Sequence, residues 1–268
     1  MGGEFYLNRH NEHLIDQYLA NVNKSILVDF TKEDSDTLLI SFSGRGRVAV
    51  KPPTFELFRT TNEMGVNRIL IRDLNKAWFH KGLVNISGVD CFDDMVAYLE
   101  EIIPANRFKK IIVIGLSLGG YSALLFGLLT KLKVTVHAFG PQTFLDKEGR
   151  VYEESIRWLL PFLDEVPGNV PPNYMDLIRI FRERGEKNTQ PENELHIHYG
   201  HPDKVYAERL NGLDGVHLYD YNIHMHNLLV FFRERGELTQ LLNHLFFTPE
   251  SDWNLDSYRE PRDLTVQL

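Results

Sequence analysis

The sequence predicts an α/β fold in which a mostly parallel central sheet is flanked by helices. Seven short apolar runs recur along the 268 residues, and several are separated by segments long enough for a crossover helix. Hydrophobic residues make up 43% and charged residues 25%, close to the average of globular proteins. These values exclude disordered, collagen-like and coiled-coil chains. We expect a single domain, residues 1–268, with a sizeable core.

The apolar runs are expected to form buried strands, because parallel strands covered on both faces read as nearly continuous hydrophobic segments. Strands that alternate with helices imply a sheet with helices on both faces. In chain order the expected strands are Ser25–Phe30, Thr37–Phe42, Arg68–Asp73, Lys110–Ile114, Val134–Phe139, Glu194–Tyr199 and Val216–Asp220.

Three segments between or after these runs carry helical patterns. Apolar residues recur at helical spacing in Asp90–Ile103, which predicts an amphipathic helix. Leu118–Leu132 is apolar nearly all round and is therefore expected to be buried. His226–Phe246 is expected to form a long terminal helix with an interruption near Gly236.

The segment between Phe144 and Pro191 breaks this alternation, because it contains no strong strand pattern. It carries two helical patterns instead, Tyr152–Leu163 and Tyr174–Arg184, among several prolines. We expect residues 145–191 to be a helical insertion over the carboxyl edge of the sheet. It forms either a cap over a site or an ordinary excursion of the packing.

The net charge and the cysteine content restrict the possible binding partners and the cellular compartment of the protein. The formal net charge is −8, and an acidic surface repels phosphate backbones, so no nucleic-acid partner is expected. Cys91 is the single cysteine, which excludes an internal disulfide and favours a reducing compartment. Met1–Asn11 contains charged residues and no long apolar run, which argues against a secretory signal. We therefore expect a cytoplasmic protein.

One uncharged stretch, Ile111–Thr130, has the length of a membrane span. It begins with a β-branched run, passes through a centre rich in glycine and serine, and ends in a half rich in leucine and alanine. That change of composition is typical of a buried strand, a tight turn and a buried helix. No membrane span is expected.

The centre of this stretch, Gly115-Leu116-Ser117-Leu118-Gly119-Gly120, has the form G-x-S-x-G of a nucleophile elbow. In such an elbow the serine lies on a sharp turn between strand and helix, and its hydroxyl projects clear of the sheet. Glycines two positions before and after leave room where strand and helix nearly collide. The helix N-terminus directs free N–H groups to the same place. The alternative is a packing turn made of small residues.

In this pattern the sequence resembles the α/β-hydrolase superfamily, from about Ser25 to about Leu242. The resemblance implies a catalytic triad in the chain order serine, acid, histidine, with the acid after a late strand. Asp203 follows the expected strand at Glu194–Tyr199, and Pro202 fixes the intervening turn. Asp146, after an earlier strand, is the alternate acid.

The resemblance also implies a histidine after the last strand and an oxyanion hole. Two histidines follow that strand; His226 is favoured because it immediately precedes an apolar helix, and His224 is the alternate. Backbone N–H groups of Leu118 and of Gly44 or Arg45 are expected to hold the oxyanion. Members of the superfamily often have His-Gly in this second loop, whereas this sequence has Ser43 before the glycine.

These residues predict a serine hydrolase that cleaves an ester or thioester through an acyl-enzyme, without a cofactor. The substrate is expected to be a small-molecule or carrier-linked acyl compound. Two alternatives remain open at this point. The same acyl-enzyme serves an acyltransferase, and the same fold serves a non-catalytic binding or scaffold protein.

Two further patterns compete with this interpretation. Residues 44–49 fit the dinucleotide motif G-x-G-x-x-A, but the prolines at 52 and 53 argue for a loop where that motif requires a helix. The pairs His196/His198 and His224/His226 suggest a nitrogen-rich metal site. No carboxylate-rich metallohydrolase motif accompanies them, so no metal is expected.

Overall fold

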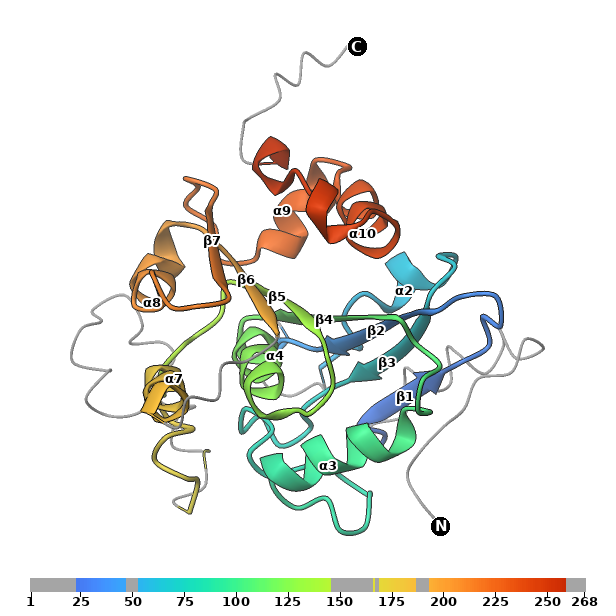
Figure 1. Ribbon diagram of the computed structural model, residues 1–268, viewed down its shortest axis with the longest axis vertical. Helices are drawn as coiled ribbons and strands as arrows, with labels where there is room; N and C mark the ends of the chain where they lie inside the picture. The colour runs from blue at the N-terminus through green and yellow to red at the C-terminus, as the bar shows by residue number, and fades with distance from the viewer. Residues whose placement is uncertain (1–22, 47–52, 146–165, 167–168, 187–192, 259–268) are drawn as a thin grey trace.

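The computed structural model describes residues 23–46, 53–145, 166, 169–186 and 193–258, and the seven expected strands form one sheet (Figure 1). The strand order across the sheet is β1-β3-β2-β4-β5-β6-β7. β1 pairs antiparallel with β3, and every other pairing is parallel. The expectation of a mostly parallel sheet is therefore confirmed. The strands are β1 (Ile26–Asp29), β2 (Thr37–Phe42), β3 (Asn67–Ile71), β4 (Lys110–Leu116), β5 (Thr135–Phe139), β6 (Glu194–Tyr199) and β7 (Val216–Asp220).

The bounds of β1, β3, β4 and β5 differ from the sequence prediction by one or two residues, and the carboxyl ends of β4 and β3 differ for local reasons. β4 extends two residues beyond Ile114, because Gly115 and Leu116 still pair with β5. β3 ends at Ile71 rather than at Asp73. The Asp73 carboxylate accepts hydrogen bonds from the N–H groups of Asn75 and Phe79, both at 2.9 Å, and so closes a turn at this point.

Helices cover both faces of the sheet (Figure 1). The expected interruption of the terminal helix is confirmed, because Gly236, with φ +71°, separates two helices. One face carries α3 (Phe92–Ile102), α4 (Leu118–Leu129), α7 (Leu177–Glu186) and α8 (Lys204–Glu208). The other face carries α2 (Phe58–Thr61), α9 (Leu228–Glu234) and α10 (Leu238–Phe247). The chain also contains three 3₁₀ turns among the described residues: η2 (His201–Asp203), η3 (Glu250–Asp252) and η4 (Leu255–Tyr258).

Side-chain alternation along the strands divides the core into two clusters. Ile40 of β2 and Val113 of β4 pack with α3 and α4 on one face. Leu39 and Ile112 pack with α9 and α10 on the other. All four are fully buried, and each such side chain stabilises the fold by about 1.5–3 kcal/mol relative to exposure.

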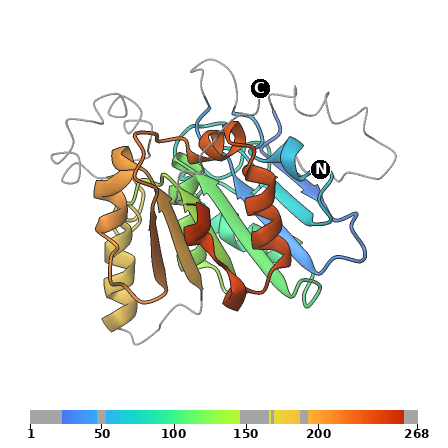
Figure 2. The same ribbon diagram turned by 90° about the horizontal axis from the view of Figure 1, so that it is seen from above.

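The described part of the expected insertion packs against the body of the protein. α7 corresponds to the second helical pattern, and its Leu177 and Ile180 are buried in the core. The Tyr174 hydroxyl donates a 2.6 Å hydrogen bond to Asp93 of α3, and the Tyr121 hydroxyl of α4 donates to the Tyr174 carbonyl. Figure 2 shows α7 and α8 on the same side of the sheet, near β6 and β7. The pattern Tyr152–Leu163 lies outside the described residues, so a cap remains a prediction.

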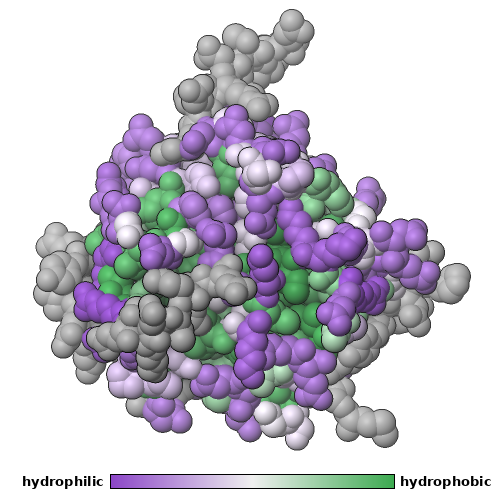
Figure 3. Space-filling model, in the orientation of Figure 1, coloured by the Kyte–Doolittle hydropathy of each residue, from purple (hydrophilic) through white to green (hydrophobic). Residues whose placement is uncertain are grey.

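The stretch with the length of a membrane span folds as strand and helix, as expected. Ile111–Leu116 belongs to β4, and α4 begins at Leu118. Within the described ranges, no helix is both long and apolar enough to cross a membrane. Hydrophilic side chains surround smaller hydrophobic areas on the face seen in Figure 3.

Candidate active site

Ser117 lies on the sharp turn between β4 and α4, with φ 55° and ψ −117°. A non-glycine residue in this region of backbone space costs about 1–3 kcal/mol and persists only where the surroundings enforce it. Here the Ser117 N–H donates a 2.9 Å hydrogen bond to the carbonyl of Phe139 at the end of β5. The turn therefore has the strain and position expected of a nucleophile elbow.

The two glycines that flank Ser117 have no room for a side chain. A Cβ atom at Gly115 would lie 2.0 Å from the carbonyl oxygen of Gly119, and one at Gly119 would lie 2.1 Å from that of Phe42. These contacts are between backbone atoms, which cannot move aside. The sequence suggests that these glycines allow a close approach of strand and helix. The structure shows this close approach.

A continuous hydrogen-bonded chain joins Ser117, His226 and Asp203. Oγ of Ser117 lies 2.9 Å from Nε2 of His226, and Nδ1 of His226 lies 2.7 Å from Oδ1 of Asp203. The three residues come from the ends of β4, β7 and β6 respectively, all at the carboxyl edge of the parallel sheet. In this arrangement the imidazole can accept the serine proton while the carboxylate holds the other ring nitrogen as N–H.

Asp203 is placed by the turn that follows β6 and is 2% exposed. Pro202 lies in η2, which ends at Asp203, as the sequence suggests. Burial raises the pKa of the Asp203 carboxyl, and the hydrogen bond from His226 opposes this shift. Oδ2 of Asp203 is buried and has no hydrogen-bond partner among the described residues. The bond to His226 is therefore the main stabilisation of the carboxylate charge.

His226 precedes α9 directly, and His224 has a different environment. The side chain of Asn227 accepts a 3.0 Å hydrogen bond from the N–H of Val230, which caps α9 immediately after His226. His224 is exposed, and its Nε2 lies 3.1 Å from Nδ1 of His201. Of the two candidate histidines, His226 is the one within hydrogen-bond distance of Ser117. The alternate acid, Asp146, lies outside the described residues.

The expected oxyanion loop follows β2 beside the nucleophile strand. A Cβ atom at Gly44 would lie 3.1 Å from the carbonyl oxygen of Leu116, the residue before Ser117. Ser43 anchors the loop: its N–H donates to the carbonyl of Ile71, and its hydroxyl accepts from the N–H of Glu56, both at 2.9 Å. The loop is thus next to the elbow. The roles of Gly44, Arg45 and Leu118 as oxyanion donors remain predictions.

Sequence reasoning missed Gly140, which lies beneath the histidine–aspartate pair. Gly140 follows β5, and its φ is +53°. A Cβ atom there would lie 2.9 Å from Oδ2 of Asp203 and 3.2 Å from Nδ1 of His226. The available signal was the Gly-Pro dipeptide directly after an expected strand.

The histidine pairs that suggested a metal have other partners. His196 and His198 share one face of β6, as expected, and their rings stack on His137 with centroid distances of 4.6 and 5.3 Å. In the part of the chain that the structure describes, no group of three or more His, Cys, Asp or Glu side chains is arranged to hold a metal ion. The dinucleotide motif falls partly on residues 47–52, which lie outside the described ranges.

Comparison with known proteins gives matches in structure and none in sequence. No family model matches this chain, and no curated protein matches it. The fluorophosphonate-binding serine hydrolase F of Staphylococcus aureus matches with a TM-score of 0.50 and 13% identity over 78% of this chain and 83% of that chain.

Two other structures match over most of the chain. The capsule O-acetyltransferase of Neisseria meningitidis serogroup A has a TM-score of 0.52 and 15% identity, over 76% of this chain and 87% of that chain. An acylaminoacyl peptidase of Pyrococcus horikoshii has a TM-score of 0.54 and 12% identity, over 88% of this chain and 41% of that chain. At such identities these likenesses show a shared fold.

Proposed function

We propose that this chain, which has the α/β-hydrolase fold, is a serine hydrolase that cleaves an ester or thioester through an acyl-enzyme. The observation that carries the proposal is the hydrogen-bonded chain Ser117–His226–Asp203, with distances of 2.9 and 2.7 Å. Its members follow one another in the order serine, acid, histidine along the sequence, which is the order that the fold uses for catalysis.

In the acylation step, the Ser117 hydroxyl transfers its proton to Nε2 of His226 while Oγ attacks the substrate carbonyl carbon. The carbonyl π-electrons move to oxygen, and N–H groups of Leu118 and of Gly44 or Arg45 stabilise the resulting oxyanion. One such donor is worth about 2.7–4 kcal/mol. When the oxyanion collapses, the bond to the alcohol or thiol breaks. The leaving group takes the proton from His226, and the acyl group remains on Ser117.

In the deacylation step, water gives a proton to His226 and attacks the acyl carbon. Collapse of the second oxyanion releases the carboxylic acid and returns the proton to Ser117. Asp203 stays ionised throughout and holds Nδ1–H of the imidazole, which stabilises the imidazolium that forms in each step. No external oxidant, reductant or cofactor is needed for this balance.

Acyl transfer is the second candidate, because the same intermediate can react with a hydroxyl or amine in place of water. The observation that favours acyl transfer as a candidate is the fold shared with the capsule O-acetyltransferase of Neisseria meningitidis. Transfer requires an acceptor to occupy the water position and water to be kept out. Product analysis with added alcohol, amine or water alone separates the two reactions.

The decisive experiment combines covalent labelling with turnover. The protein is treated with a fluorophosphonate probe and assayed with p-nitrophenyl esters of increasing acyl length. We expect labelling of Ser117, located by peptide mass spectrometry, and hydrolysis of at least one ester. Ser117→Ala should abolish both, and His226→Ala should reduce both by several orders of magnitude.

His224→Ala is the matched control, since it removes an imidazole two residues away without touching Ser117. It should retain labelling and turnover. Labelling that survives in Ser117→Ala would place the nucleophile elsewhere. Absence of both labelling and turnover in the folded wild-type protein would instead favour a binding or scaffold role.

A further inference from the structure

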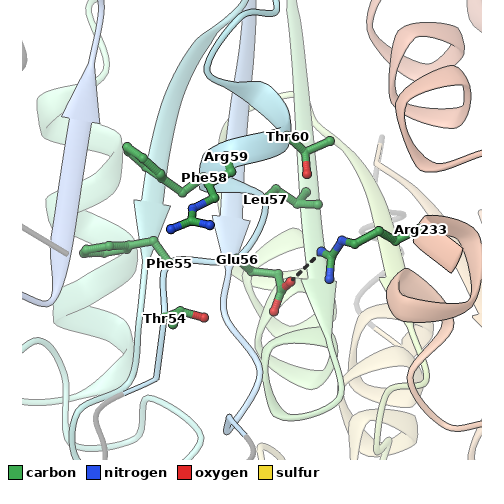
Figure 4. A pocket seen from close by; sticks show the side chains of 8 residues that line it. All are labelled: Thr54, Phe55, Glu56, Leu57, Phe58, Arg59, Thr60 and Arg233. Atoms are coloured by element: carbon green, nitrogen blue, oxygen red, sulfur yellow. Dashed lines mark ion pairs between the residues drawn. The ribbon is translucent and has the colours of Figure 1, made fainter. Parts of the chain in front are cut away.

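A pocket of about 500 Å³, with both polar and apolar lining groups, lies between residues 54–60 and α9 (Figure 4). On one side of the pocket, the ring of Phe55 packs against the Arg72 guanidinium at 4.4 Å and that of Phe58 against the Arg68 guanidinium at 5.0 Å. The groups that line it include Thr54, Glu56, Leu57, Arg59, Thr60 and Arg233.

Opposite charges face each other across this pocket (Figure 4). A carboxylate oxygen of Glu56 lies 3.9 Å from a guanidinium nitrogen of Arg233. This ion pair is longer than a charge-assisted hydrogen bond, which usually measures about 2.7–2.9 Å. The side chain of Glu56 is 20% exposed and that of Arg233 is 52% exposed. Burial raises the pKa of the Glu56 carboxyl, and the charge of Arg233 and a backbone hydrogen bond from Leu57 oppose this shift. The carboxylate is mostly buried, and its ion pair with Arg233 leaves room for a closer hydrogen-bond donor.

The pocket adjoins the expected oxyanion loop, because one of its lining residues, Glu56, is hydrogen-bonded to that loop. The N–H of Glu56 donates to Oγ of Ser43, the residue before Gly44 in the expected oxyanion loop. Arg233 lies on α9, the helix that begins two residues after His226. A group bound beside Glu56 and Arg233 would therefore touch a residue that is hydrogen-bonded to the oxyanion loop and a residue of the helix that follows the proposed base.

We propose that this pocket is a recognition subsite for the leaving group of the substrate, and that it binds a zwitterionic group with an ammonium and a carboxylate, as at the end of an amino acid. The inference rests on the proposed hydrolase function. Glu56 accepts hydrogen bonds from the ammonium group. Arg233 donates to the carboxylate, and the exposed Arg59 adds positive charge at the rim.

Other ligand classes match these charges less well. A simple anion places its charge against the Glu56 carboxylate, and a simple cation meets Arg233 and Arg59. An apolar group removes water from Glu56 without replacing its hydrogen bonds, which is costly for a buried charge. A neutral polyol can bridge the pair, but neutral hydrogen bonds are about half as strong as charge-assisted ones. A zwitterion satisfies both signs at once.

The test compares four esters that share one acyl group, chosen as the best of the p-nitrophenyl series. The leaving groups are L-serine (zwitterionic, joined through its side-chain oxygen), choline (cationic), 3-hydroxypropanoate (anionic) and ethylene glycol (neutral). Assays at about pH 6.5, more than one unit below the usual α-amino pKa, keep the ammonium charged and limit acyl migration. We expect the serine ester to have the highest kcat/KM.

Variants at the charged pair locate this preference. Glu56→Gln and Arg233→Gln should each lower kcat/KM for the serine ester roughly 10- to 100-fold, the value of one hydrogen bond to a charged group. Both should lower kcat/KM for the ethylene glycol ester much less, so that the ratio of kcat/KM for the serine ester to that for the ethylene glycol ester falls. The matched controls are Glu101→Gln on α3 and Arg182→Gln on α7, which make the same charge changes at exposed positions. These should change nothing.

A second measurement does not depend on variants. Free L-serine should competitively inhibit hydrolysis of the ethylene glycol ester by the wild-type protein, and 3-hydroxypropanoate should inhibit more weakly. Two results would overturn the subsite and leave the hydrolase proposal intact: equal kcat/KM for all four esters, or equal inhibition by L-serine and 3-hydroxypropanoate. No hydrolysis of any ester, together with no labelling of Ser117, overturns both.

Discussion

The backbone of Gly140 lies close against the side chain of Asp203: a Cβ atom added to Gly140 would lie 2.9 Å from Oδ2 of Asp203. The same atom would lie 2.7 Å from the carbonyl oxygen of His226. Gly140 also has φ +53°, which glycine adopts without strain. The backbone after β5 can therefore pass directly beneath the histidine–aspartate pair, and this close approach allows the pair its 2.7 Å contact.

Gly140→Ala should damage the site as well as the backbone. The positive φ alone costs about 1–2 kcal/mol for alanine, and the added methyl pushes on Asp203 and His226. We expect the rate of fluorophosphonate labelling to fall at least tenfold. Gly212→Ala is the control, because Gly212 has φ +78° but no atom within 4 Å of its virtual Cβ. If the two variants have similar unfolding midpoints but Gly140→Ala is labelled more slowly than Gly212→Ala, the result supports a role of Gly140 in positioning Asp203 and His226. Equal labelling of the two variants would contradict it.

Asp203→Asn should leave the shape of the site intact and remove its charge. An amide cannot hold Nδ1 of His226 as N–H in the same way, so the imidazole adopts the wrong tautomer for accepting the serine proton. We expect kcat to fall about 10⁴-fold, as for a comparable substitution in a serine protease triad. Asp214→Asn, in an exposed turn, should keep full activity. Hydrolysis by Asp203→Asn within tenfold of wild type would indicate that another residue supplies the acid.

Ser43→Ala should loosen the loop that carries the proposed oxyanion donors. It removes the buried acceptor of the Glu56 N–H, and an unsatisfied buried donor costs about 1–3 kcal/mol. We expect kcat to fall more than KM changes, because the oxyanion forms only during reaction. Ser41→Ala is the control, since the Ser41 hydroxyl makes a longer bond of 3.4 Å to the Glu56 carbonyl. Equal losses of kcat in both variants would argue for a general loss of folding.

Buried histidines make the fold sensitive to acid. Burial lowers the pKa of His80 and of His196 to about 3, and holds those of His137 and His198 well below their usual range. These rings are neutral in the folded protein at moderately low pH, whereas the unfolded chain protonates them below about pH 6.5. The unfolded state then binds more protons, so the free energy of unfolding falls as pH decreases from about 6.5 toward 3.

His80→Gln should flatten part of this pH dependence. Between neutral pH and about pH 4.5, a histidine with a folded pKa near 3 accounts for roughly 2–3 kcal/mol of lost stability. Urea unfolding at both pH values measures the difference for wild type and variant. His224→Gln, which changes an exposed ring, should keep the wild-type difference. An unchanged difference in His80→Gln would show that His80 is protonated in the folded protein.

Local patterns predicted the sheet well, because burial on both faces leaves a continuous apolar run in each strand. β2, β6 and β7 have the predicted bounds, and α4 is buried on every turn, as its composition requires. The glycine at position 115 was also readable, since the clash that it avoids is with Gly119, four residues later, whereas the clash at Gly119 is with the distant Phe42.

Contacts between distant segments were not readable in the same way. His224 and His226 are two residues apart and chemically identical, so no local pattern decides which ring faces Ser117. The answer depends on Gly200, where a Cβ atom would lie 2.6 Å from the carbonyl oxygens of both Ile223 and Met225. The loop before His226 therefore packs closely on the end of β6, and this packing sets the position of the ring.

The sequence by itself determined the strands, the buried helix and the elbow at Ser117, because short-range burial and backbone sterics act between neighbours in the chain. The tertiary structure decided that His226 and Asp203 meet Ser117, that Gly140 lies beneath them, and that Glu56 faces Arg233. These pairs are separated by tens of residues or more, and only the pairing of parallel strands brings their carboxyl ends to one edge. The order of residues in the sequence does not show which of these side chains lie close together, because their proximity depends on that strand pairing.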